Sequence, residues 1–147
     1  MDRIKYMINQ LIDVCSKTKT KLPLIAKDNR LGKNYLGSMH PAKKKTNGKT
    51  VWLMRYNEKR ITKEKLSKCY IKMFICHEIG HIRTKGKTLE EREYKAEKFA
   101  LNTIRKYYPE YYQRALQETR IVAKYAYHKV YRVAFAKLLK EIENGMV

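Results

Sequence analysis

Acidic residues are scarce in this chain of 147 residues: 14 Asp and Glu stand against 34 Lys and Arg, which gives a formal net charge of +20 at pH 7. Much of the excess falls between residues 17 and 49, where ten basic side chains, including the run Lys43-Lys44-Lys45, accompany a single acid, Asp28. Such a surface attracts polyanions by releasing their counterions. Because basic charge alone does not identify a partner, nucleic-acid binding through Lys43, Lys44 and Lys45 is treated as an alternative.

Cysteine is also scarce, and long apolar runs and a signal-like N-terminus are missing. Three Cys with no paired spacing exclude a disulfide framework. No stretch reaches transmembrane length, and residues 1–16 lack the apolar core and small-residue cleavage site of a signal peptide. We therefore expect a cytoplasmic protein without a membrane partner. The 44% share of hydrophobic residues argues against a disordered chain, and the length predicts a single domain over residues 1–147.

The N-terminal half shows both helical and extended patterns. Apolar residues recur at helical spacing from Asp2 to Ser16. Residues 22–27 and 36–40 are candidate short strands, and Asn47-Gly48 is a tight-turn signal that leads into a further apolar run over 51–56. These segments predict a small, mostly antiparallel sheet.

A second helical pattern begins at Thr62 or Ser67 and continues to Arg83. Its apolar residues wind around most of the circumference, which is typical of a buried central helix. Gly86 is suited to a left-handed residue just after the end of this helix.

The remainder of the chain is expected to be helical. Thr88 and Glu91 have the form of a capping box and open a helix that reaches about Tyr107. Pro109 ends it, and the pattern is helical again from Glu110 onward.

The segment His77-Glu78-Ile79-Gly80-His81 lies inside the predicted buried helix. Residues four apart share a helix face, so both imidazoles can direct nitrogens at one ion at about 2.0–2.1 Å, the distance zinc prefers. Glu78 can reach a water at that ion and act as its base. Two His and a Glu on a buried helix are costly without a partner, so the pattern predicts a zinc site. Gly80 removes a side chain and would let another element approach.

A catalytic zinc requires a third protein ligand and an open position. The following helix offers Glu90, Glu91, Glu93 and Glu97. The first two are explained by the capping box and the helix dipole. Glu93 and Glu97 share a face with Ala96, whose small side chain allows close packing. The residues alone leave Glu93 and Glu97 as alternatives.

The two-His motif, followed by Glu93-Tyr94-Lys95-Ala96-Glu97-Lys98-Phe99-Ala100, resembles the gluzincin metallopeptidases. In that group a helix with Glu-x-x-Ala-acid-x-Phe-Ala follows the two-His helix. The chain looks most like the small ImmA/IrrE-type peptidases of phages and mobile elements, over roughly residues 51–104. It shares the Glu-x-x-Ala-acid pattern of HtpX-like membrane peptidases but lacks their spans. The resemblance implies that Glu93 is the third zinc ligand and that Glu97 orients a ligand His.

Some features depart from these families. After Ala100 the chain continues Leu101-Asn102, not with the Leu-Leu-Met-Pro-like run frequent in the ImmA/IrrE group, and Glu93 follows His81 by only twelve positions. SprT-like proteases of DNA–protein crosslinks are a neighbouring possibility. They usually take a third His as a zinc ligand, and no His stands just downstream of His81.

Together these observations predict an α+β, zincin-like fold with a small sheet, an active-site helix, a ligand helix and a helical C-terminal extension from about residue 110. The expected activity is hydrolysis of peptide bonds in an intracellular protein or peptide by a zinc-activated water. The zinc ligands would be His77, His81 and Glu93, with Glu78 as base. The alternative is a basic nucleic-acid-binding module with a structural or vestigial metal site, which the lack of Cys at ligand spacing disfavours.

Overall fold

The computed structural model describes residues 6, 10, 24–27, 37–46, 49–56 and 67–146. Backbone contacts divide the chain into two units, Met1–Lys68 and Cys69–Val147. Of the helix expected over residues 2–16, only Tyr6 and Gln10 are described. Both are helical, and the Gln10 amide donates a hydrogen bond to the Tyr6 hydroxyl at 3.0 Å.

The described part of the first unit contains three strands, β1 (Leu24–Lys27), β2 (Gly37–Thr46) and β3 (Lys49–Tyr56), in the order β1-β3-β2. β3 pairs with β1 in parallel and with β2 antiparallel. Pro41 stands opposite Trp52 in the outer strand β2. Proline has no N–H for a ladder, so an edge strand is where it is tolerated. The β2–β3 register shifts between Ala42 and Lys45.

The second unit is entirely helical, and the predicted α+β, zincin-like fold class is therefore wrong for it. Residues 68–147 hold the candidate site and contain no strand in their described part. The strand signals end at residue 56, and the following apolar residues recur at helical spacing instead of alternating. Whether residues 1–147 form one domain stays a prediction.

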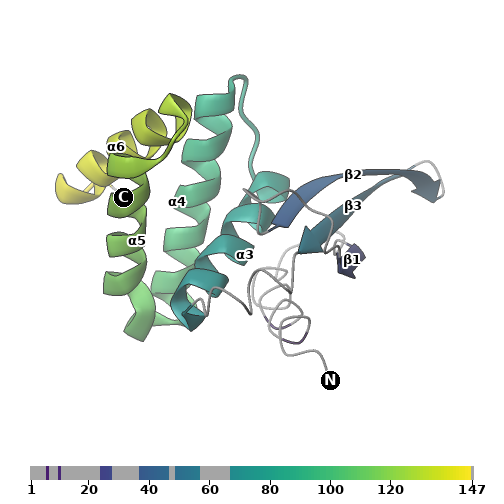
Figure 1. Cartoon of the computed structure of the whole chain (residues 1–147), viewed down its shortest axis with the longest axis horizontal. Coiled ribbons are helices and arrows are strands. Elements are labelled where there is room, and N and C mark those ends of the chain that lie inside the picture. Colours follow the sequence, from purple (N-terminus) through teal and green to yellow (C-terminus); the bar gives the residue numbers. More distant parts are fainter. Residues whose placement is uncertain are drawn as a thin grey trace. The chain divides into compact units, whose positions relative to one another are not determined.

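Four α-helices make up this unit (Figure 1). They are α3 (Lys68–Arg83), α4 (Leu89–Tyr107), α5 (Tyr112–Tyr125) and α6 (Lys129–Glu143), with a 3-10 turn η1 (Pro109–Tyr111) before α5. The helical stretch expected from Glu110 onward is thus interrupted, because Ala126 adopts extended backbone with ψ 138° and ends α5. No helix in the described part is both long and apolar enough to cross a bilayer.

α3 is the buried helix that its sequence predicts. Ile75 and Cys76 are fully buried, and Ile71, Met73 and Ile79 are nearly so. The buried Lys72 ammonium lies 4.2 Å from the centre of the Tyr108 ring, a cation–π contact that helps to offset its burial.

The start of α4 confirms one of the two hydrogen bonds of the predicted capping box; the second goes to the residue before the N-cap residue Thr88. Thr88 Oγ1 accepts the Glu91 backbone N–H at 3.1 Å, and the Glu91 carboxylate reaches back to the Lys87 N–H at 2.9 Å. The left-handed conformation expected of Gly86 is wrong, since Gly145 alone among the described glycines has a positive φ. Gly86 instead avoids a steric clash, because a Cβ at this position would lie 2.8 Å from the backbone nitrogen of Arg92.

α3 and α4 meet closely at Gly80. A Cβ on Gly80 would lie 2.8 Å from the carbonyl oxygen and 2.9 Å from the Cα of Ala96, which is itself fully buried. Two small residues thus let the two backbones approach, as the motif suggested. α4 also packs against α5 and α6, so it connects α3 with the C-terminal helices.

Replacing Gly80 with Ala should lower the free energy of unfolding by about 1–3 kcal/mol, the usual cost of forcing extra atoms into a packed core. The sign of the change in unfolding free energy distinguishes the two cases, because Gly-to-Ala in an uncrowded helix stabilises the protein by about 1 kcal/mol. Urea unfolding measures the effect. Ala136→Gly, at an exposed position of α6, reports helix propensity alone. A more stable Gly80→Ala protein would contradict the close crossing.

Candidate metal centre

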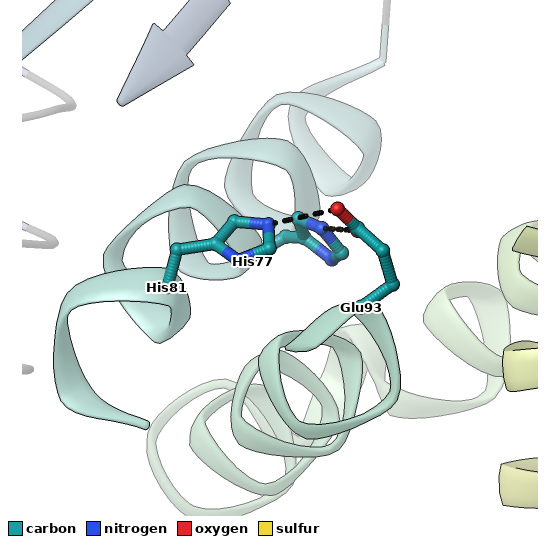
Figure 2. Close-up of side chains that lie close together, drawn as sticks. All are labelled: His77, His81 and Glu93. Atoms are coloured by element: carbon teal, nitrogen blue, oxygen red, sulfur yellow. Dashed lines mark hydrogen bonds and ion pairs between the residues drawn. The ribbon is translucent and has the colours of Figure 1, made fainter. Parts of the chain in front are cut away.

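Helix α3 presents its two histidines to helix α4. His77 and His81 are one helical turn apart, and their ring centroids lie 4.8 Å from each other at an interplanar angle of 80°. Glu93 projects from α4 toward both rings (Figure 2). One ligand atom from each of the three side chains lies within 4.8 Å of the others, so the group could hold a metal ion.

The Glu93 carboxylate spans the two imidazoles. Its Oε2 lies 2.8 Å from His77 Nε2, and its Oε1 lies 3.3 Å from His81 Nε2. Both histidines therefore turn the same ring nitrogen toward one carboxylate. The Glu93 side chain is 7% exposed, against 14% for His77 and 22% for His81. The group is thus largely withdrawn from water and is most open on the His81 side.

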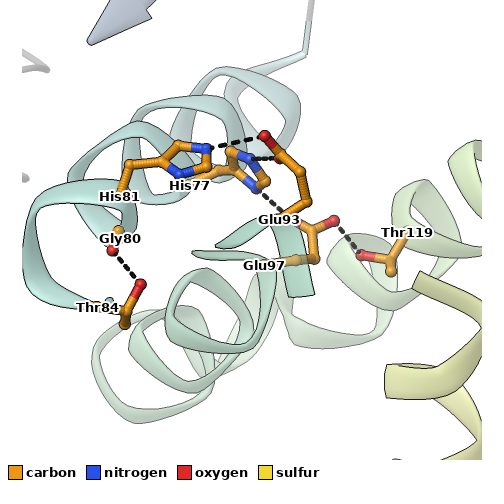
Figure 3. Close-up of polar contacts among 7 residues, drawn as sticks. All are labelled: His77, Gly80, His81, Thr84, Glu93, Glu97 and Thr119. Carbon is orange, nitrogen blue, oxygen red and sulfur yellow. Dashed lines mark hydrogen bonds and ion pairs between the residues drawn. The ribbon is translucent and has the colours of Figure 1, made fainter. Parts of the chain in front are cut away.

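Glu97 contacts the opposite edge of the His77 ring. It lies one helical turn after Glu93, and its Oε1 is 3.0 Å from His77 Nδ1 (Figure 3). Its other oxygen, Oε2, lies 3.1 Å from the Thr119 hydroxyl. Glu97 is outside the three-residue group. A carboxylate that accepts the Nδ1–H of a histidine fixes the ring and leaves Nε2 available to an ion.

Two further contacts hold α3 and the His77 ring in place. At the end of α3, the Gly80 carbonyl accepts both the Thr84 backbone N–H at 2.9 Å and the Thr84 hydroxyl at 2.7 Å, which holds the last turn closed. The buried Phe135 of α6 places its ring centroid 6.0 Å from that of His77, in an edge-to-face arrangement. His77 is therefore bounded by carboxylates on α4 and by an aromatic ring on α6.

The acid–base properties of the group follow from burial and close contact. Burial lowers the pKa of His77, but hydrogen bonds to Glu93 and Glu97 outweigh this effect and raise the pKa from 6.5 to about 10. Burial raises the pKa of Glu93, yet hydrogen bonds to His77 and His81 outweigh it and lower the pKa from 4.5 to about 2. Without a metal, His77 thus carries a proton on each nitrogen at neutral pH.

Glu78 follows the first histidine but is not part of the three-residue group. Burial raises the pKa of its carboxyl, whereas the charges of His77 and His81 lower it, and the net shift is upward. The charges of His77, His81 and Glu93 therefore act on the pKa of Glu78. A raised carboxyl pKa is suited to accepting and returning a proton near neutral pH.

Sequence reasoning did not identify Thr119 or Phe135 as parts of this site. Thr119 had a signal of its own, because it is a polar residue one turn after Ala115 on a face of α5 that is otherwise buried and apolar. Phe135 had none that separated it from an ordinary core residue. The basic run Lys43-Lys44-Lys45 lies in β2 at the register shift, and its side chains are outside what the structure describes.

Comparisons with protein-family models, with curated proteins and with solved structures find no match to this chain.

The unfolding of the metal-free protein should depend on pH through this group. Because the pKa of His77 is raised to about 10, its stabilisation is complete below pH 6.5 and is lost as the pH rises through 10. Because the pKa of Glu93 is lowered to about 2, its stabilisation is complete above pH 4.5 and is lost as the pH falls through 2. The group should therefore stabilise the fold most between pH 4.5 and 6.5.

Urea unfolding in the presence of a chelator, from pH 6 to pH 9, tests the alkaline side. The free-energy difference between the wild type and His77→Gln should be largest at pH 6 and should narrow as the pH rises. Taking the difference cancels residues that titrate elsewhere. A difference that stays constant over this range would contradict the assignment of the proton to His77.

The two carboxylates of α4 should differ in their effect on metal binding. Glu93→Ala removes a ligand atom and should reduce divalent-metal affinity by more than about 100-fold, whereas Glu97→Ala removes an orienting contact and should cost about 10- to 100-fold. Metal content after dialysis and chelator competition measure both variants. Stronger loss in Glu97→Ala than in Glu93→Ala would exchange their roles.

Proposed function

We propose that this chain is a zinc-dependent metallopeptidase of the gluzincin type, similar to the ImmA/IrrE peptidases, which hydrolyses peptide bonds in a protein substrate. The observation that carries the proposal is the convergence of two imidazoles from one turn of α3 with the Glu93 carboxylate of α4. Glu78 follows His77 in α3, and burial raises the pKa of its carboxyl.

The donor set favours zinc over other common ions. Two imidazole nitrogens and one carboxylate oxygen suit Zn²⁺, whereas Mg²⁺ and Ca²⁺ prefer ligands that are all oxygen. A zinc ion at this position would supply a Lewis acid that polarises a peptide carbonyl and makes water more acidic. Both nitrogens that face Glu93 are Nε2 atoms, which is consistent with one shared ion.

The number of ligands supports a catalytic role over a structural one. Structural zinc sites usually have four protein ligands, while catalytic sites have three and an open position. In the part of the chain that the structure describes, His77, His81 and Glu93 are joined by no fourth His, Cys, Asp or Glu. Cys69 and Cys76 are buried in α3 and are not members of the group.

Each side chain of the site would have a separate role in the reaction. Glu78 takes a proton from the attacking water and returns it to the leaving amine, a transfer that the raised pKa of its carboxyl favours. Glu97 holds the Nδ1–H of His77 and so keeps the ring in one orientation. The low exposure of Glu93 and His77 keeps most water away and strengthens electrostatic interactions at the reacting bond.

Changing Glu78 to Gln should leave zinc bound and reduce peptide hydrolysis by about 10²- to 10⁴-fold, the usual contribution of a general base. The substitution keeps the size of the side chain but removes its ability to accept a proton. Cleavage is measured by mass spectrometry on a peptide library prepared from a whole proteome, with zinc content determined on the same samples.

Glu90→Gln is the matched control, because Glu90 is an exposed acid in the first turn of α4 and lies outside the site. It should cleave the library at the wild-type rate. Equal cleavage by Glu78→Gln and the wild type would remove Glu78 as the base. A zinc-loaded wild type that cleaves nothing in the library would count against the peptidase proposal itself.

A further inference from the structure

The Glu97 carboxylate is held at both of its oxygens. Oε1 lies 3.0 Å from His77 Nδ1 on α3, and Oε2 lies 3.1 Å from the Thr119 hydroxyl on α5 (Figure 3). Because each oxygen has its own partner, the carboxylate cannot turn about its terminal bond without losing one contact. The orientation of the His77 ring is thereby linked to a helix that follows in the chain.

Thr119 occupies a position where packing alone would favour an apolar side chain. It is 1% exposed, and the other buried residues of α5 are Ala115 and Leu116. Its hydroxyl is also 3.1 Å from the Ala115 carbonyl oxygen, four residues earlier. A hydroxyl has one proton to donate, and a carboxylate is a stronger acceptor than a backbone carbonyl. The two acceptors are equally distant, so the negative charge of the carboxylate favours donation to Glu97.

We propose that Thr119 is a positioning residue of the metal centre. It holds Glu97 in the orientation that accepts His77 Nδ1–H, and this keeps His77 Nε2 directed at Glu93 and the shared ion position. This inference rests on the proposed function in one respect, namely that the group binds a metal. Thr119 itself contacts neither the ion position nor a substrate, so its effect reaches the site through Glu97.

The expected effect is smaller than that of a direct partner. Removing a residue that contacts a ligand typically weakens metal binding by about 10- to 100-fold, so a residue one contact further out should cost about 3- to 10-fold. Thr119→Val has nearly the same shape without the hydroxyl and should show this loss in a competition titration of Zn²⁺ against a coloured chelator. Thr119→Ser keeps the hydroxyl, and its zinc affinity should stay within about twofold of that of the wild type.

Thr103 offers a matched control in α4. It is also a buried threonine, and its hydroxyl donates to the carbonyl of Phe99, four residues earlier, at 2.8 Å. Thr103→Val therefore removes the same kind of back-bond to the helix without touching Glu97. It should leave the zinc affinity unchanged, and a loss equal to that of Thr119→Val would show that a general packing defect is responsible.

A double-mutant cycle with Glu97→Gln separates positioning from packing. If Thr119 acts through Glu97, Thr119→Val should cause little additional loss in the Glu97→Gln background, whereas an undiminished loss would overturn the inference. Thr119→Ala replaces the valine variant if circular dichroism shows that the latter does not fold. A wild type that binds no zinc rejects the proposed function, while a wild type that binds zinc with Thr119→Val unaffected rejects the role of Thr119 alone.

Discussion

The Glu93 carboxylate is buried between two imidazoles, and keeping it there without a compensating positive charge would cost several kcal/mol, in the range of about 3–5 for a broken buried pair. In the metal-free chain a proton on His77 supplies that charge, which is why the pKa of His77 rises to about 10. A divalent ion would supply it more fully. Proton and metal therefore compete for the Nε2 lone pair of His77, and metal binding is coupled to proton release.

The distribution of acidic residues supports the same view. The chain has only 14 acids against 34 basic residues, yet in the described part the two buried acids, Glu93 and Glu97, both contact His77. Buried carboxylates are costly unless paired or bound to metal. The scarce acids of the core are therefore gathered at His77, beside the group of His77, His81 and Glu93 that could hold a metal ion.

Local geometry explains which features could be read from the sequence. The spacing of His77 and His81, the cap at Thr88 and the small residue at Gly80 depend on one helix or one crossing, and a helical period determines them. The predicted fold class was wrong because the strand signals end at residue 56, and residues 68–147, which hold the candidate site, are helical and without a strand in their described part. Glu93 and Glu97 are one turn apart on the same face, so only the packing of α4 against α3 distinguishes their contacts. Thr119 meets Glu97 across a separation of 22 positions, beyond the reach of any periodicity.

The contacts of the two histidines are unequal, and the His77 ring is held on more sides than the His81 ring. His77 is bounded by Glu93 and Glu97 of α4 and by Phe135 of α6, and through Glu97 it is linked to α5. His81 is more exposed and lies 3.3 Å from Glu93, compared with 2.8 Å for His77. An ion entering from the His81 side would displace the proton between His77 and Glu93, and their 2.8 Å contact would have to widen, because ligand atoms about 2.0–2.1 Å from a tetrahedral zinc lie roughly 3.3 Å apart. The His77 ring is already held by Glu97 and Phe135, which lowers the entropy lost on binding, and the helices after residue 110 contribute to this through Thr119 and Phe135.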